Sequence, residues 1–356
     1  MKAPAILSRR ASGLVGAGLL LLCLPAWWID RTALLAAWLV ALLFCLDVAL
    51  GGLANVWVHN LTGGAWGEAI RVPLLTLGRA LPALAVLFLP VLAGLPDLYP
   101  WAAGGNDWSA ELSAPAFKDA WLTPGAFALR AVVVLLLWNA LAWASRRPAW
   151  GRARGFAAGA LIVYGLSLGL AAVDWLMSLT PLWYSSIFGL AVGVGQVLAG
   201  LAFAAVAACR REEAVDASTR RDLGNLLLAY VLTWGYLAFS QFLIIWSENL
   251  PHEISWYVMR RDGGWLALGI AVAVLQFALP LLALLFRAVK DSPRRLGWLA
   301  GGLLAAHFLD VCWLVLPSVG RALVPWHLLW LLPLTALGLP ALCYGLLPPT
   351  GELHHA

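Results

Sequence analysis

Charged residues are scarce in this chain. Of its 356 residues only 12% are Asp, Glu, Lys or Arg, whereas 62% are hydrophobic and the mean hydropathy is +0.85. An average soluble domain has about 25% charged residues, so this composition excludes an ordinary soluble fold. The ionisable groups that do occur inside apolar stretches are therefore informative, because charge in a lipid interior is expensive.

Motifs for redox cofactors and nucleotides are missing too. The five cysteines are Cys23, Cys45, Cys209, Cys312 and Cys343. They form no CxxC or CxxCH pattern, which excludes an iron–sulfur cluster or a c-type haem bound by this chain alone. A b-type haem would need two axial histidines at matching depth, and His59, His307 and His327 are expected at three different depths. The chain also has no P-loop and no GxGxxG motif, so chemistry driven by ATP or NAD is not expected.

Long apolar runs dominate what is present. About 20 apolar residues cross one bilayer, and on that basis ten segments qualify. They are residues 13–28, 32–58, 73–94, 125–145, 155–178, 184–209, 221–246, 263–287, 297–317 and 324–347. The basic N-terminus and the run from Leu14 imitate a signal peptide, but no small-x-small cleavage site follows, so the first helix is expected to stay uncleaved. We predict an all-α polytopic membrane protein that forms a single membrane domain over residues 1–356.

The Lys and Arg residues are divided unevenly between the two sides of the ten spans. Sixteen of the 23 fall on the side that holds the N-terminus, in segments around Lys2, Arg71, Arg146, Arg210 and Arg287. By the positive-inside rule, both termini are predicted to be cytoplasmic. Topology thus accounts for the net charge of +5, and nucleic-acid binding is not expected.

Two long segments are expected on the opposite, outer side. Residues 95–124 combine Asp97, Asp107, Glu111 and Asp119 with three tryptophans, and residues 246–264 mix charged and aromatic side chains. An acidic and aromatic outer-face loop suits the docking of a partner subunit. The alternative for residues 95–124 is a lid that lies on the lipid headgroups.

Small residues cluster in the middle of the chain. The spacings Gly165/Gly169 and Gly189/Gly193 both match GxxxG, and Gly195 and Gly200 follow. Small residues let helix backbones approach closely in a membrane. This pattern predicts tight helix packing.

Six ionisable residues lie inside or at the ends of the predicted spans. They are Asp47, His59, Asp174, Glu248, His307 and Asp310. His307 is expected at mid-depth of the ninth span, and Asp310 lies about 4.5 Å further out on the same face. Asp47 is central in the second span, His59 is near an inner end, and the other two acids are near outer ends. The six therefore predict a ladder of groups across the membrane.

Two interpretations of this ladder remain open. A proton relay needs ionisable groups bridged by water, and a quinone headgroup needs a His or Asp beside an apolar slot. Alternatively, the groups pair with each other and hold the bundle together, for instance Asp47 with Arg130 or Arg79. No residue is assigned a catalytic role from the sequence alone, and no metal site is expected.

Four stretches of the chain resemble one membrane-protein family. The stretches are DWLMSLTPLWYSSIFG from Asp174, FSQFLIIWSENLPHEISW from Phe239, HNLTGGAW from His59 and HFLDVCWLVLP from His307. Together they resemble the ActF-like membrane subunit of alternative complex III, a bacterial quinol:cytochrome c oxidoreductase, within the polysulfide reductase (NrfD-like) family. The similarity covers nearly the whole chain, and the first two stretches are its most specific part.

The resemblance assigns positions residue by residue. His307 and Asp310 match the family's pair in the ninth helix, and Asp174 and Glu248 match its outer-face acidic positions. The histidine-rich start that precedes the TGG motif in the family is reduced here to His59 followed by Asn60. One proton-carrying group of the family is therefore missing.

The resemblance also implies an architecture and a setting. It implies two four-helix bundles, residues 32–180 and 184–317, flanked by the first and last helices, in the bacterial cytoplasmic (inner) membrane. It implies a sister NrfD-like membrane subunit, an iron–sulfur protein and c-type cytochrome subunits as partners, which hold the iron–sulfur clusters and haem c. In that family quinol oxidation is assigned mainly to the sister subunit, so for this chain the resemblance implies a quinone-facing or proton-conducting role.

Three hypotheses follow for the function. The first is a membrane subunit of a quinol-oxidising respiratory complex that faces the quinone or conducts protons. The second is a non-catalytic anchor that seats the redox partners. The third is a secondary transporter, for which Pro280, Pro333 and Pro340 supply the broken helices that transporters use.

Overall fold

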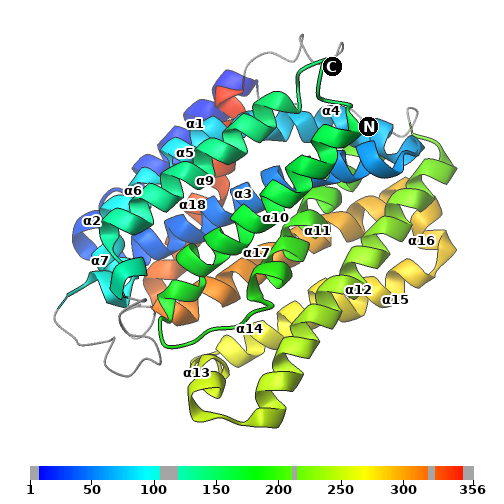
Figure 1. Cartoon of the computed structure of the whole chain (residues 1–356). Helices are drawn as coiled ribbons and strands as arrows, with labels where there is room; N and C mark the ends of the chain where they lie inside the picture. Colours follow the sequence, from blue (N-terminus) through cyan, green and yellow to red (C-terminus); the bar gives the residue numbers. More distant parts are fainter. Residues whose placement is uncertain (1–7, 105–118, 211–214, 320–324, 348–356) are drawn as a thin grey trace.

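The structure is all-helical, as predicted. It is a computed structural model that describes residues 8–104, 119–210, 215–319 and 325–347, and every regular element in those residues is a helix (Figure 1). Ten spans are long and apolar enough to cross a membrane. They are Arg9–Ile29, Arg31–Thr62, Ala65–Ala93, Pro124–Ala144, Arg154–Leu179, Phe188–Cys209, Ala217–Glu248, Trp265–Leu285, Pro293–Val319 and Trp326–Leu346. The ten predicted segments are confirmed, although the third begins at Ala65 instead of residue 73.

Six of the spans consist of one long helix. These helices are α3 (Arg31–Thr62), α9 (Pro124–Ala144), α11 (Phe188–Cys209), α12 (Ala217–Glu248), α17 (Pro293–Val319) and α18 (Pro325–Leu346). A seventh, α10 (Arg154–Trp175), continues into the 3₁₀ turn η3 (Met177–Leu179). Between the spans lie the short helices α7 (Leu95–Leu98), η2 (Pro100–Ala102), α13 (Pro251–Met259) and α16 (Arg287–Asp291).

The remaining three spans are interrupted, each next to a proline. The first consists of α1 (Arg9–Leu21) and α2 (Ala26–Ile29), which begins just after Pro25. The third consists of α4 (Ala65–Leu77), η1 (Gly78–Ala80), α5 (Leu81–Val86) and α6 (Leu89–Ala93). The eighth consists of α14 (Trp265–Val272), the π-helical turn η5 (Ala273–Ala278) and α15 (Leu279–Leu285). Pro82, Pro90 and Pro280 sit at the restarts, because proline cannot donate the helical hydrogen bond to the residue four positions earlier.

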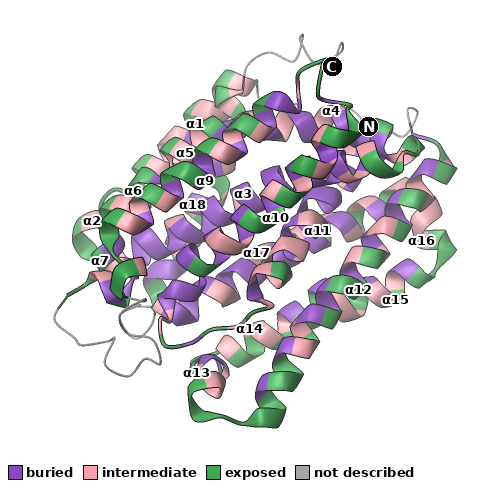
Figure 2. Cartoon of the chain, in the orientation of Figure 1, coloured by how far each residue is buried: buried purple, intermediate pink, exposed green. Residues whose placement is uncertain are grey.

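Helix α3 forms the centre of the molecule. In its most apolar window 83% of the residues are buried, against 22–50% in the other nine spans, and it is the continuously buried helix in Figure 2. It packs against α4, α10, α11, α17 and α18. An apolar surface on all sides suits a helix enclosed by others. An ionisable residue in the middle of α3 therefore lies deep inside the bundle.

Close packing of α3 against α11 depends on glycine, as the small-residue pattern predicted. A Cβ on Gly200 would collide with the backbone of Gly51 and Gly52. Elsewhere the prediction is only partly right, since a Cβ on Gly165 would meet nothing within 4 Å. The contact between α3 and α11 joins residues 32–180 to residues 184–317, whose division into two four-helix bundles stays a prediction.

Helices α1 and α18 pack against each other over much of their length. The start of α1 meets the end of α18, because a Cβ on Gly13 would lie 3.1 Å from the Cα of Gly345. At the other end, His327 of α18 contacts Asp30, the N-cap of α3, with 2.6 Å between His Nδ1 and Asp Oδ2. The first and last helices are thus antiparallel neighbours, and both ends of the described chain lie on one side. That this side is cytoplasmic stays a prediction from the basic residues.

The outer-face loop of residues 95–124 is described at its two ends. Its start folds into α7 and η2, where Trp101 and Tyr99 pack on Phe127 at ring distances of 5.4 and 5.3 Å. Asp97 pairs with Arg31 at 3.2 Å. The acidic residues Asp107 and Glu111 lie outside the described residues, so the docking and lid interpretations both stay predictions.

The N-terminus of α12 provides a test of pH-dependent stability. Hydrogen bonds from Thr219 and Ser218 to the Asp216 carboxylate lower the pKa of Asp216 from 3.8 to about 2. A lowered folded-state pKa gives stability that is present above the unfolded value and lost as the pH falls through about 2. Asparagine caps a helix as well as aspartate but does not titrate. We therefore expect the Tm of Asp216→Asn in detergent to fall less than that of the parent between about pH 4 and pH 2; equal falls would contradict this.

Candidate functional site

The centre of the bundle holds a buried carboxylate–imidazole pair. Asp47 of α3 and His307 of α17 are 260 positions apart in sequence, and their Oδ2 and Nε2 atoms are 2.9 Å apart. Their side chains are only 7% and 4% exposed. Of the two partners proposed for Asp47 as a structural pair, Arg130 is wrong, because Arg130 binds another acid. Asp47 contacts the histidine of the ninth span instead.

A second carboxylate lies beside this pair. Asp310 is one helical turn from His307 on the same face of α17 and is also buried. Gln276 donates a hydrogen bond from Nε2 to Asp310 Oδ2 at 3.2 Å, and the Trp234 indole also hydrogen-bonds to Asp310. Gln276 belongs to the π-helical turn η5, and π turns are frequent at functional sites. The extra residue in the turn places a fully buried amide against the carboxylate.

Neutral polar side chains extend the cluster through the bundle. Gln196 of α11 donates from Nε2 to Asp47 Oδ1 at 2.6 Å, and the Tyr164 hydroxyl of α10 donates to Gln196 Oε1 at 2.7 Å. The sequence interpretation considered only ionisable groups and missed Gln196, Gln276 and Tyr164. Amides and hydroxyls inside otherwise apolar spans were the available signal, because each needs a buried partner.

One nitrogen of the central histidine has no partner. Nε2 of His307 is occupied by Asp47, whereas Nδ1 is buried and has no hydrogen-bond partner among the described residues. Gly195 of α11 faces this edge of the ring, since a Cβ there would lie 3.2 Å from His307 Cε1 and 3.6 Å from Nδ1. A buried unpaired polar atom is costly unless something binds it. The missing side chain at Gly195 leaves room for a ligand atom at Nδ1.

The cluster lies in the wall of a cavity of about 640 Å³. Leucine, alanine, valine and aromatic residues make up most of the wall, and Asp47, His307 and Asp310 are its ionisable acid and imidazole groups. Among the described residues that line the cavity there is no Lys or Arg. An apolar pocket of this size with a few convergent polar groups is typical of a small-molecule site.

The charges of the cluster define what it can do. Two carboxylates and one imidazole face each other with no Lys or Arg among the described lining residues. Since two unpaired negative charges in a low-dielectric interior repel strongly, the arrangement favours a bound proton on His307 or on one of the acids. A shared, movable proton is the property that acid–base chemistry needs.

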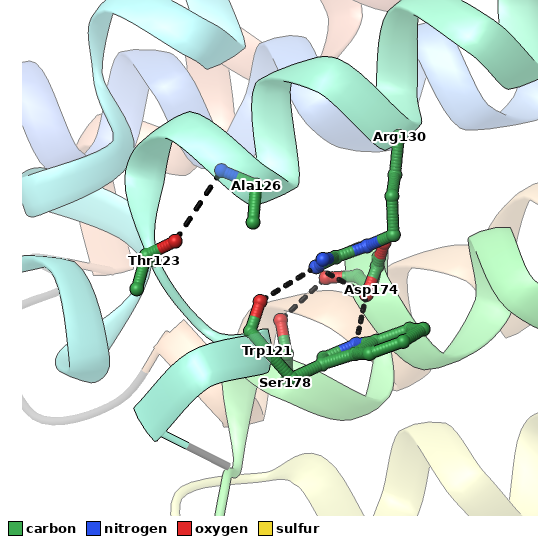
Figure 3. Close-up of polar contacts among 6 residues, drawn as sticks. All are labelled: Trp121, Thr123, Ala126, Arg130, Asp174 and Ser178. Atoms are coloured by element: carbon green, nitrogen blue, oxygen red, sulfur yellow. Dashed lines mark hydrogen bonds and ion pairs between the residues drawn. The ribbon is translucent and has the colours of Figure 1, made fainter. Parts of the chain in front are cut away.

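Asp174 belongs to a separate ion pair (Figure 3). Its Oδ2 lies 2.6 Å from Nε of Arg130, and its Oδ1 accepts from Arg130 Nη2 at 3.1 Å and from the Trp121 indole at 2.9 Å. The Arg130 guanidinium also lies over the Trp121 ring at 4.1 Å. Asp174 is not among the residues that line the cavity. The structure therefore does not bring it together with the central cluster.

Glu248 and His59 also lie away from the cluster. Glu248 is exposed at the last turn of α12. His59 donates a hydrogen bond from Nε2 to the carbonyl oxygen of Gly64 at 2.9 Å. Gly63 and Gly64 have φ values of +74° and +103°, so this motif forms the sharp turn from α3 to α4, which only glycine adopts without strain. The contact places His59 at that turn.

Arg260 is a buried cation that the sequence interpretation did not single out. It lies after α13, and its guanidinium donates to the carbonyls of Trp313 and Leu314 at 3.1 and 2.8 Å and to Ser318 Oγ at 2.6 Å. Pro317 cannot donate to the carbonyl of Trp313, so Arg260 replaces the missing donor. Burial lowers the pKa of Arg260 to about 9, which leaves it charged at neutral pH. Arg260 thereby ties α13 to the end of α17.

The fold and site define a multi-pass α-helical membrane protein with a buried acid–histidine cluster beside an apolar cavity. No protein-family model matches the chain, and no curated protein matches it either. The resemblance to the ActF-like, NrfD-like family therefore depends on the sequence motifs alone.

Proposed function

We propose that this chain is an ActF-like membrane subunit of a bacterial quinol:cytochrome c oxidoreductase complex, and that its cavity binds the quinol ring. The observation that carries this proposal is the unpartnered, buried Nδ1 of His307 at the wall of an apolar cavity. A quinol offers the matching chemistry, since its hydroxyl groups donate hydrogen bonds and the rest of the molecule is apolar.

The geometry suggests how a proton would leave the quinol. With Asp47 ionised, Nε2 of His307 carries the proton that it donates to Asp47, and Nδ1 has a free lone pair. Nδ1 then accepts the proton of one hydroxyl, and Asp47 stabilises the resulting imidazolium. Asp310 lines the same cavity and would take the second proton. Iron–sulfur and haem groups of partner subunits would accept the two electrons, so that quinol becomes quinone, two protons and two electrons.

A second candidate function is proton conduction without a bound quinol. The series of hydrogen bonds from Tyr164 through Gln196 and Asp47 to His307 favours it, because it links His307 to side chains of three other helices. A polar connection of this kind supports proton movement when water bridges its gaps. The two candidates differ in whether the cavity must hold a ring at His307 Nδ1.

The proposed setting is the bacterial inner membrane with both termini in the cytoplasm. The excess of Lys and Arg on the side of the termini supports this orientation. The aromatic segments of the other side suit contact with an iron–sulfur protein and c-type cytochromes. Isolation of the chain in mild detergent tests the assembly: the expected result is co-purification with subunits that absorb as c-type haem, and recovery of the chain alone would contradict it.

Gly195→Ala tests ligand binding at the histidine. The new Cβ would lie 3.2 Å from His307 Cε1 and 3.6 Å from Nδ1, so it would crowd this edge of the ring. We expect the affinity of the purified complex for a short-chain quinol to fall roughly tenfold or more, because the methyl group takes the space that the quinol hydroxyl would occupy at Nδ1. The measurement is a binding titration with decylubiquinol.

The matched control for this test is Gly301→Ala on α17, where a Cβ would meet nothing within 4 Å. Its quinol affinity should equal that of the parent. If Gly195→Ala also leaves quinol binding unchanged while proton release is reduced, the proton-conducting candidate replaces the quinol-binding one. If neither quantity changes, both candidates are wrong and the anchor hypothesis gains.

A further inference from the structure

A row of exposed apolar residues on α12 forms one edge of the cavity. Leu232, Tyr236, Phe239 and Phe242 are 46%, 69%, 61% and 44% exposed, and all four also line the cavity. Their spacings of four, three and three residues place them along one face of the helix. Residues that both line a cavity and face the surroundings mark its mouth. The mouth therefore runs along α12.

The α10 side of the cavity is lined by Ala171 and Ala172, which are themselves buried. Helices α10 and α12 do not pack closely on each other. The cavity that both helices line is therefore not closed by a helix–helix contact between them, and we place the mouth between α10 and α12.

The end of the cavity nearest α13 is covered. Trp256 and Tyr257 of α13 line it, and Trp256 stacks on Trp183 with 5.0 Å between ring centroids and 21° between planes. The Trp256 ring also meets Trp313 edge-on at 5.0 Å, and Arg260 lies over it at 3.5 Å. These aromatic contacts cover that end of the cavity. Residues 232–242 lie within the candidate membrane span Ala217–Glu248.

We propose that the cavity opens sideways into the hydrocarbon core between α10 and α12, and that it takes an amphiphile with an uncharged ring and a long apolar chain. The ring lies against Asp47, His307 and Asp310, and the chain passes over the α12 edge into lipid. This inference depends on the proposed function for the identity of the ring. The mouth is the evidence for the ligand's apolar tail, because a wall of apolar side chains accommodates a hydrocarbon tail without desolvating any polar group.

The lining excludes a phospholipid as the ligand class. A phosphate headgroup in an apolar interior needs a cation or several donors. None of the described lining residues is Lys or Arg, and the polar end already carries two carboxylates. A neutral ring with hydroxyl groups fits this end, and an anionic headgroup does not. An isoprenoid quinol combines such a ring with the apolar chain.

Ala238→Trp tests the sideways mouth through the ligand. Ala238 is half-buried on α12 and lines the cavity, so we expect an indole there to narrow the cavity beside the α12 edge. In the purified complex in nanodiscs, we expect binding of decylubiquinol to weaken roughly tenfold or more, because its tail loses apolar contacts. Binding of the tail-less ring, ubiquinol-0, should stay within about twofold. Ile244→Trp, on the exposed part of α12 that does not line the cavity, is the matched control and should change neither.

The contrary results are distinct. If Ala238→Trp weakens the binding of both quinols equally, or weakens neither, the sideways mouth is overturned. If neither probe binds the parent complex, the proposed quinol function fails, and a second measurement then decides the mouth by itself. A nitroxide on Ala238→Cys should be relaxed by lipid-dissolved oxygen and not by aqueous nickel–EDDA. Relaxation mainly by the nickel complex would show that the cavity opens to water and would overturn the proposal.

Discussion

Replacing His307 by glutamine is expected to reduce quinol oxidation by the assembled complex about 100-fold or more, the usual loss when a general base is removed. Glutamine keeps roughly the size of the imidazole and can still donate a hydrogen bond to Asp47, but it cannot take up a proton. The expected reduction reflects the lost proton acceptor at Nδ1, which is the unpartnered atom of the site. Steady-state turnover with decylubiquinol and an electron acceptor measures it.

The chain offers a matched control for this experiment. His327 is the second buried histidine that contacts an aspartate, with 2.6 Å between its Nδ1 and Asp30 Oδ2, and it does not line the cavity. His327→Gln therefore repeats the chemical change away from the site and should leave turnover near the parent value. Full turnover in His307→Gln, with the complex intact, would contradict the proposed role of His307 as the proton acceptor.

Removing the Asp174 carboxylate is expected to produce the largest loss of stability. Asp174→Leu leaves the Arg130 guanidinium, whose side chain is only 16% exposed, without its counter-ion (Figure 3). Breaking one side of a buried ion pair costs about 3–5 kcal/mol, because the remaining charge is uncompensated. A lower Tm and a lower yield of folded protein in detergent are the expected results.

The double variant Arg130→Met/Asp174→Leu separates pairing from packing. Replacing both members of a buried pair by apolar residues is often neutral, so the double variant should regain most of the stability that the single variant loses. The exposed pair Glu68–Arg152 is the control: its side chains are 51% and 57% exposed, and its removal should cost about 1 kcal/mol or less. A double variant as unstable as Asp174→Leu would contradict this explanation.

Two parts of the HFLDVCWLVLP motif have different roles in the structure. His307 and Asp310 face the cavity, whereas Pro317, in the last turn of the same helix, leaves the carbonyl of Trp313 without its helical donor, and Arg260 binds that carbonyl. The spacing of His307 and Asp310 predicted a shared face because a helix repeats every 3.6 residues. The partner for Pro317 was not predictable in this way, because Arg260 belongs to a separate segment that only the fold brings near.

The glycines also show that local sequence does not predict contacts between distant segments. The pattern around residues 189–200 predicted close helix packing, and Gly200 does pack on the backbone of Gly51 and Gly52. Gly195, five residues earlier, instead faces the open edge of His307. The sequence does not distinguish a glycine that packs on another helix from one that leaves space beside a functional side chain. The difference depends on which element lies opposite the glycine in the fold.

The sequence by itself determined the ten membrane spans, the all-helical fold and the group of ionisable residues from which the site is built. It could do so because a chain in lipid must satisfy its backbone hydrogen bonds within each helix, so that local hydropathy decides the spans. Only the tertiary structure decided the partners: Asp47 meets His307 across 260 positions, Asp174 meets Arg130, and Glu248 and His59 lie apart. The cavity and the open Nδ1 edge of His307 belong to that second level as well. Such pairings depend on how helices cross and rotate against one another, and that information is spread over all the packing surfaces of the bundle.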